Sequence, residues 1–157
     1  EGSVPGPWTV TFAQAAGNDG FSATFDKLEG WTVSADERVK FYSGNAPYSS
    51  TFPIEGKPAS VSLDLGEVMV LSDVKVNGKD AGGVWTSPYR LDISPLVHSG
   101  ENTLEVTVYN NWKNRLIHDA ALPKNSVRGT WTNIDPYSAD DERQSSGLLG
   151  PVRLFVE

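Results

Sequence analysis

The stretch Val74-Lys75-Val76-Asn77-Gly78-Lys79-Asp80-Ala81 decides the predicted fold of this chain. Two valines in alternate positions precede Asn77-Gly78, and the apolar residues Ala81 and Val84 follow it. An Asn-Gly pair is the strongest short signal for a two-residue type I′ turn, because both central positions of that turn require positive φ. We therefore predict a β-hairpin here, with one face of each strand buried.

The same alternation of apolar and polar residues recurs along the chain, as in Trp8-Thr9-Val10-Thr11-Phe12. Clusters of Gly, Pro, Asn, Asp and Ser separate these segments at intervals typical of an all-β sandwich or barrel, and helical periodicity is scarce. The predicted strands, with the first arm of the hairpin included, are residues 8–12, 21–25, 39–43, 49–54, 60–65, 73–77, 90–93, 103–109 and 152–156. The aromatic residues that we assign to the core are Trp8, Phe12, Phe25 and Phe41.

Length and composition suit one ordinary domain. With 157 residues and 17.0 kDa, the chain is expected to form a single domain over residues 1–157. The absence of cysteine excludes disulfides, thiolate zinc sites and cysteine nucleophiles. A net charge of −7 argues against binding to nucleic acid or to an anionic membrane surface. Because the chain begins at Glu1 and Met69 is its only methionine, we expect a processed product or a piece of a longer protein.

Residues 111–147, called the excursion below, interrupt the alternation. The excursion holds too many large apolar residues for a disordered linker, but neither a period of 2 nor one of 3.6 organises them for long. We therefore predict a long ordered loop before the last strand, and loops of this length are usually functional. Cations predominate in residues 111–131 and anions in residues 135–143, so the two parts are expected to attract each other.

Catalytic and metal-binding motifs are weak. His98 and His118 have neither a nucleophile motif nor a second histidine at metal-ligand spacing, although His118 lies in the excursion and is a candidate for contact with a ligand. A glycosidase needs two carboxylates that face each other across a sugar, and Asp119 with Asp135 carry that alternative without a specific signal. No cofactor is expected. A structural calcium ion is left open, because oxygen ligands from loops suit the rim of a β-sandwich.

Aromatic residues give the clearest functional indication. The chain has five Trp, five Tyr and six Phe, and several of them fall at or beyond the ends of predicted strands. Flat rings can stack on the C–H faces of sugars while amide and charged groups bind the hydroxyls, so these residues suit a carbohydrate. The alternative is that they anchor the excursion to the sandwich, and we favour it for Trp112 and Trp131. The candidate residues for carbohydrate binding or for a domain interface are Trp85, Tyr89, Asn111, Trp112, Asn114, Arg115, Asp119 and Trp131.

Two groups of motifs resemble those of known families. The first group resembles the galactose-binding-like jelly-roll domain of many glycoside hydrolases, and it comprises LDLGE (63–67), VKVNGKD (74–80), Trp85, PYRLDI (88–93) and GENTLEV (100–106). The second group is similar to the accessory β-sandwich domain of family 106 α-L-rhamnosidases, and it comprises NNWKNRLIHD (110–119), Arg128, TWT (130–132) and SGLLGPV (146–152). With GPW (6–8) and FYSG (41–44), the resemblance covers nearly the whole chain. His118 departs from it, because the family pattern has Gly there.

The resemblance implies a jelly-roll β-sandwich that assists a polysaccharide-degrading glycoside hydrolase and carries no catalytic residue itself. It implies packing on the catalytic domain of the parent enzyme, at most weak binding of a glycan or oligosaccharide, and a periplasmic or extracellular location. The alternative function is a free-standing secreted carbohydrate-binding or adhesion protein. The gene that encodes the chain discriminates between the two, because only the first requires an adjacent catalytic domain.

Overall fold

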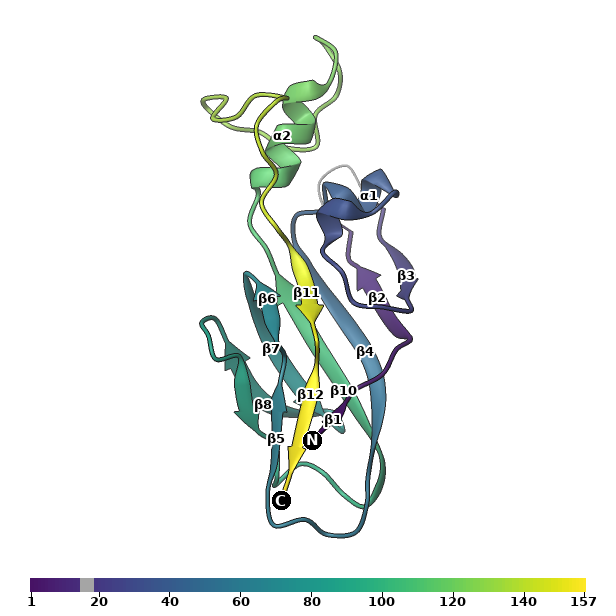
Figure 1. Cartoon of the computed structure of the whole chain (residues 1–157). Helices are drawn as coiled ribbons and strands as arrows, with labels where there is room; N and C mark the ends of the chain where they lie inside the picture. The colour runs from purple at the N-terminus through teal and green to yellow at the C-terminus, as the bar shows by residue number, and fades with distance from the viewer. Residues whose placement is uncertain (15–18) are drawn as a thin grey trace.

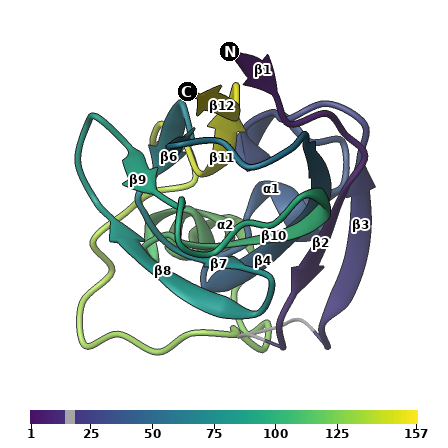
Figure 2. The ribbon, with the colours of Figure 1, turned by 90° about the horizontal axis from the view of Figure 1, so that it is seen from below.

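The chain folds into a β-sandwich of antiparallel sheets in a computed structural model that describes residues 1–14 and 19–157. One sheet has six strands in the order β3-β2-β4-β10-β7-β8, the second has four in the order β1-β12-β5-β9, and β11 pairs with β6. Figure 2 shows these sheets on opposite sides of the interior. The predicted all-β jelly-roll class is confirmed. The strands are β1 (Gly2–Ser3), β2 (Trp8–Phe12), β3 (Phe21–Phe25), β4 (Asn45–Ile54), β5 (Val61–Asp64), β6 (Glu67–Met69), β7 (Leu71–Val76), β8 (Lys79–Val84), β9 (Arg90–Asp92), β10 (Gly100–Tyr109), β11 (Gly147–Gly150) and β12 (Arg153–Val156).

The predicted hairpin joins β7 to β8. Val76 pairs with Lys79 across the two-residue turn, and φ is 52° at Asn77 and 74° at Gly78, as a type I′ turn requires. The Asn77 side chain also fastens the turn to β10, because its Oδ1 accepts a hydrogen bond from the Thr103 amide at 3.0 Å. The hairpin therefore lies at one edge of the six-stranded sheet and is tied to the strand beside it.

The hydrophobic core lies between the sheets, and the predicted core residues Trp8, Phe12 and Phe25 are buried in it. The centre of the core is an aromatic cluster in which the Trp31 ring packs edge-on against Phe12 and Tyr42 and parallel to Tyr48. The Trp31 indole Nε1–H donates a hydrogen bond to the Tyr48 hydroxyl. Burial raises the pKa of Tyr48 to about 12, so this hydroxyl stays neutral at ordinary pH.

The strand predicted for residues 39–43 is wrong. The chain instead forms η1 (Trp31–Val33) and a short helix α1 (Glu37–Lys40), which begins where the Asp36 carboxylate accepts a hydrogen bond from the Arg38 amide at 2.9 Å. Val39 and Tyr42 are three positions apart and both are buried, as expected for a helix. The predicted strand rests instead on alternation of apolar residues over 39–43. Phe41 consequently lies outside the core and packs against the His118 ring with 4.9 Å between centroids.

The excursion extends beyond one end of the sandwich, while both termini lie toward the other end (Figure 1). It is not only a loop, since it contains the helix α2 (Lys113–Ala121). The sequence reading missed this helix because its buried side combines the polar Asn114 and Asp119 with the apolar Ile117. A search for apolar periodicity registers only one of these three positions, so the helical period was hidden.

Candidate functional site

The excursion leaves the sandwich after β10 and returns at β11, and asparagine amides join these two legs. The Asn114 side chain is only 1% exposed, and its Oδ1 accepts from the Gln144 amide at 2.8 Å. Its Nδ2 donates to the Gln144 carbonyl at 2.7 Å and to the Ser146 Oγ at 3.1 Å. The exposed Asn111 adds a bond from its Nδ2 to the Gln144 Oε1 at 2.7 Å. The structure thus gives both asparagines a role in holding the excursion together.

Further contacts tie the base of the excursion to the sandwich. The Asn110 Nδ2 donates to the Tyr42 carbonyl at 2.8 Å, and its Oδ1 accepts from the Gly44 amide at 2.9 Å. Asn110 is the first residue of the NNWKNRLIHD motif (110–119) and is not among the predicted site residues. The Arg143 guanidinium also lies over the ring of Phe41 in the sandwich, at 5.4 Å from the ring centroid. The excursion is therefore a fixed part of the fold.

A buried carboxylate holds the middle of the excursion in place. Asp119 is 2% exposed, and its Oδ2 accepts hydrogen bonds from both the amide and the hydroxyl of Thr130. The Arg115 Nε lies 3.1 Å from the Asp119 Oδ1, one helical turn earlier in α2. Burial alone would raise the pKa of Asp119, but the hydrogen bond from Thr130 and the charge of Arg115 together hold it below its ordinary value of 3.8. Asp119 is therefore a carboxylate at neutral pH, and it connects α2 to the segment around Thr130.

The expected attraction between the two parts of the excursion is realised in one ion pair, in which the Arg128 Nη1 lies 2.9 Å from the Asp135 Oδ1. Both carboxylates of the glycosidase alternative are thus paired with arginines. A general acid needs a raised pKa, whereas that of Asp119 is lowered. The pairing of both carboxylates with arginines and the lowered pKa of Asp119 argue against Asp119 and Asp135 as a catalytic acid and base.

Two of the predicted aromatic residues meet in one groove. Trp112 lies at the start of α2, and Trp131 follows the Thr130 that Asp119 holds. They line a groove of about 410 Å³, and the residues around it are Trp112, Leu116, Gly129, Thr130, Trp131 and Thr132. Trp112 is 52% exposed and Trp131 is 87% exposed. This exposure disagrees with the favoured prediction that both rings anchor the excursion to the sandwich. Thr130 and Leu116 were not among the candidates, although the TWT motif contains Thr130.

Trp85 and Tyr89 lie elsewhere, in the connection between β8 and β9. Trp85 is 73% exposed, whereas Tyr89 is partly buried against the core. The structure therefore does not gather all the candidate residues into one site. A role of each candidate in binding a sugar or a domain stays a prediction.

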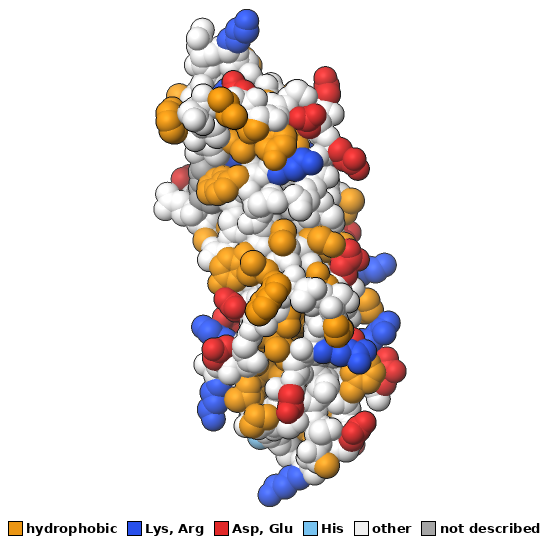
Figure 3. Space-filling model, turned by 90° about the vertical axis from the view of Figure 1, so that its left-hand side faces the viewer, with side chains coloured by type: hydrophobic (Ala, Val, Ile, Leu, Met, Phe, Trp, Pro, Cys, Tyr) orange, Lys and Arg blue, Asp and Glu red, His pale blue; other side chains and the backbone are white. Residues whose placement is uncertain are grey.

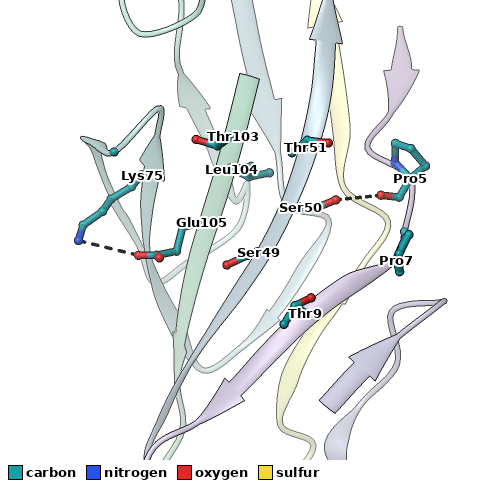
Figure 4. Close-up of a pocket in the computed structure, with 12 residues that line it drawn as sticks. Pro5, Pro7, Thr9, Ser49, Ser50, Thr51, Lys75, Thr103, Leu104 and Glu105 are labelled. Carbon is teal, nitrogen blue, oxygen red and sulfur yellow. Dashed lines mark hydrogen bonds and ion pairs between the residues drawn. The ribbon is translucent and has the colours of Figure 1, made fainter. Parts of the chain in front are cut away.

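A cavity of about 600 Å³, larger than the groove in the excursion, lies on the outer face of the six-stranded sheet (Figure 4). Thr9, Ser49, Glu105 and Lys75 form one row across four strands of its floor, with 3.8 Å between the charged atoms of the last two. The Ser50 hydroxyl donates to the Pro5 carbonyl at the opposite wall. None of the predicted site residues lines this cavity, and none of its lining residues is aromatic.

Among residues 1–14 and 19–157, no group of three or more His, Asp or Glu side chains is arranged to hold a metal ion. Within the same residues, no helix has the length and apolar character needed to cross a membrane.

The sandwich and its helix-bearing excursion define a class of protein, the galactose-binding-like domains of glycoside hydrolases. The chain belongs to the family described as "Glycosyl hydrolase 2 galactose-binding domain-like", whose model matches residues 34–145. This confirms the resemblance to the galactose-binding-like domains of glycoside hydrolases.

Individual relatives agree with that assignment. A rhamnosidase from Novosphingobium sp. PP1Y has a similar structure with a TM-score of 0.90 and 43% identity, over 100% of this chain and 15% of that one. A Formosa agariphila protein named "Putative beta-glucuronidase" is 38% identical over 84% of this chain and 14% of its own length. A Dictyoglomus thermophilum β-D-glucuronidase, at TM-score 0.54 and 22% identity over 69% of this chain and 19% of that one, shares the fold. The chain thus spans about one seventh of the length of the first two relatives.

Proposed function

We propose that this chain is a non-catalytic accessory domain of a polysaccharide-degrading glycoside hydrolase, and that its excursion packs on the catalytic part of that enzyme. The observation that carries the proposal is the exposure of large apolar side chains on a segment that is otherwise firmly held. Val127 and Ile134 are 96% and 69% exposed in the excursion. Figure 3 shows hydrophobic side chains at the excursion end of one face, and others farther down over the sandwich.

The energetics favour docking at this surface. Covering a fully exposed valine or isoleucine side chain stabilises a complex by roughly 1.5–3 kcal/mol. The amides of Asn114 and the carboxylate of Asp119 already hold the excursion, so little ordering entropy remains to be lost on association. A preformed apolar projection of this kind suits a contact between domains of one enzyme.

Hydrogen exchange tests the docking. We expect amides in residues 124–128 and 133–137 to exchange at least about tenfold more slowly in the full-length enzyme than in the isolated chain, because the interface around Val127 and Ile134 excludes water. Combined replacement of Val127→Ser and Ile134→Ser should remove that difference. The matched control is Val33→Ser, at a side chain that is 70% exposed in η1, and it should leave the difference unchanged. Equal exchange in the full-length enzyme and the isolated chain would contradict the docking.

We further propose that the parent enzyme is α-L-rhamnosidase-like and is exported to the periplasm or beyond the cell. The 43% identity to a rhamnosidase over the whole chain supports the first point. Polysaccharides are too large to diffuse across a membrane, which supports the second, and cell fractionation with an antibody against the chain tests it. An antigen found only in the cytoplasm would argue against export.

Turnover measurements test where catalysis resides. The full-length enzyme is expected to hydrolyse p-nitrophenyl α-L-rhamnopyranoside faster than p-nitrophenyl β-D-glucuronide, while the isolated chain hydrolyses neither. The reason is that this chain matches only about one seventh of the length of its relatives, so the catalytic groups are expected in the remaining part of the enzyme. Turnover by the isolated chain that disappears in Asp119→Asn would overturn the non-catalytic role.

A further inference from the structure

The groove between Trp112 and Trp131 has the features of a prepared binding site. Leu116 is one helical turn after Trp112, and its amide donates to the Trp112 carbonyl at 3.0 Å, so the two side chains form one wall along α2. The segment 129–132 forms the other wall. A volume of about 410 Å³ falls within the range of small-molecule sites, which is roughly 300–1,000 Å³.

The second wall is held in position before any ligand arrives. The carboxylate of the buried Asp119 accepts two hydrogen bonds from Thr130, and Arg115 supports that carboxylate from the other side. Thr130 cannot shift without breaking these bonds inside the protein, where an unpaired charge is costly. Trp131 is the next residue in the chain after Thr130, so the fold also sets the position of its backbone relative to α2. Preformed walls lower the entropy that binding costs.

The lining chemistry selects the ligand. All six lining residues are uncharged: two present indole rings, Thr132 contributes a hydroxyl group, and the Thr130 hydroxyl, which donates to Asp119, can only accept. Indole faces suit a flat array of C–H bonds, and hydroxyls and backbone amides suit a ligand that is rich in hydroxyls. We propose that this groove binds one pyranose ring of a neutral sugar, with its C–H face against Trp112 or Trp131. This inference rests on the proposed function, in which the excursion serves a glycan-degrading enzyme. It adds that the groove of the excursion contacts a sugar ring of the glycan.

The surroundings disfavour an acidic sugar. Arg115 is paired with Asp119, and Arg128 is paired with Asp135 at 2.9 Å in a small pocket that adjoins the groove. Lys113, the residue after Trp112, lies over the Tyr137 ring with 5.7 Å between its Nζ and the ring centroid. A uronate carboxylate entering the groove would therefore meet no unpaired cation among the residues that line it. Desolvating that carboxylate without a partner costs free energy, so a neutral ring is expected to bind better.

Nuclear magnetic resonance of the isolated chain tests the groove directly, because each tryptophan has its own indole N–H signal. The probes are methyl α-D-glucopyranoside, methyl α-L-rhamnopyranoside and methyl β-D-glucuronide. We expect saturable shifts of the Trp112 and Trp131 indole signals with at least one of the two neutral glycosides, and much smaller shifts with the glucuronide. The Trp85 signal should not move.

Substitutions give the matched comparison. Trp131→Ala is expected to weaken the neutral-sugar affinity about tenfold, which is the scale of losing one ring contact. Trp85→Ala removes a comparably exposed tryptophan outside the groove and should leave the affinity unchanged. Because both side chains project into solvent, both variants are expected to fold, and dispersed amide spectra verify this.

The outcomes separate this inference from the proposed function. No saturable shift with either neutral glycoside, an equal effect of Trp85→Ala, or tighter binding of the glucuronide would each overturn the neutral-sugar groove. None of these results bears on the exchange difference between the full-length enzyme and the isolated chain in residues 124–128 and 133–137, which lie outside the groove wall. Docking can therefore hold while the groove fails, and the reverse.

Discussion

Replacing Trp31 with alanine is expected to lower the free energy of unfolding by about 3–5 kcal/mol. Trp31 is fully buried, and its ring contacts the rings of Phe12, Tyr42 and Tyr48. Alanine would leave a cavity at the centre of this cluster and remove the donor to the Tyr48 hydroxyl. Urea unfolding followed by circular dichroism measures the change.

Two variants make the Trp31 result interpretable. Trp31→Phe keeps one six-membered aromatic ring but loses the fused five-membered ring and its N–H donor, so its loss of stability should be smaller than that of Trp31→Ala. Val33→Ala changes a 70% exposed side chain in the same short helix and should alter stability by no more than about 0.5 kcal/mol. A loss below about 1 kcal/mol in Trp31→Ala would mean that this cluster is not the centre of the core.

Replacing Asp119 with alanine is expected to destabilise the excursion by about 3 kcal/mol. Removing one partner of a buried ion pair costs about 3–5 kcal/mol, and the lower end applies because the Arg115 side chain keeps 15% of its exposure. The Thr130 amide and hydroxyl would also lose their acceptor. Hydrogen exchange of residues 113–132 measures this local loss. The control is Asp140→Ala, an exposed carboxylate of the same segment, which should change little.

The pH dependence of stability follows from the direction in which folding shifts the pKa of Asp119. The pKa of Asp119 is lower in the folded chain than its ordinary value of 3.8, so the folded state favours the carboxylate. Its contribution to stability is therefore fully present above about pH 4 and is lost as the pH falls through the lowered pKa. Asp119→Asn should flatten this acid-side dependence. An unchanged acid profile in that variant would show that other carboxylates cause it.

Local sequence rules predicted the sandwich well because its strands are two-sided. In β2 and β10 every second residue is buried, so the alternation of apolar and polar residues directly reports the burial pattern. The Asn77-Gly78 turn was equally predictable, since positive φ at both positions is a property of those residues themselves.

The same rules failed where the burial of a residue does not follow from its polarity. The apolar content of residues 39–43 predicts a strand, whereas the Asp36 cap and the spacing of Val39 and Tyr42 give a short helix in the structure. Helix α2 was missed because it buries Asn114 and Asp119, whose burial depends on partners about 30 and 11 residues away. No local pattern contains those partners.

Most of the strand pattern, the hairpin and the family resemblance could be predicted from the amino-acid sequence, because each depends on residues that are close together in the chain. Only the tertiary structure decided which candidates form a site. It brought Trp112 and Trp131 to one groove, left Trp85 outside it, and turned Asn114 and Asp119 inward as internal supports. The physical reason is that the groove exists only when the buried Asp119 carboxylate holds Thr130 against α2, a contact set by three-dimensional packing.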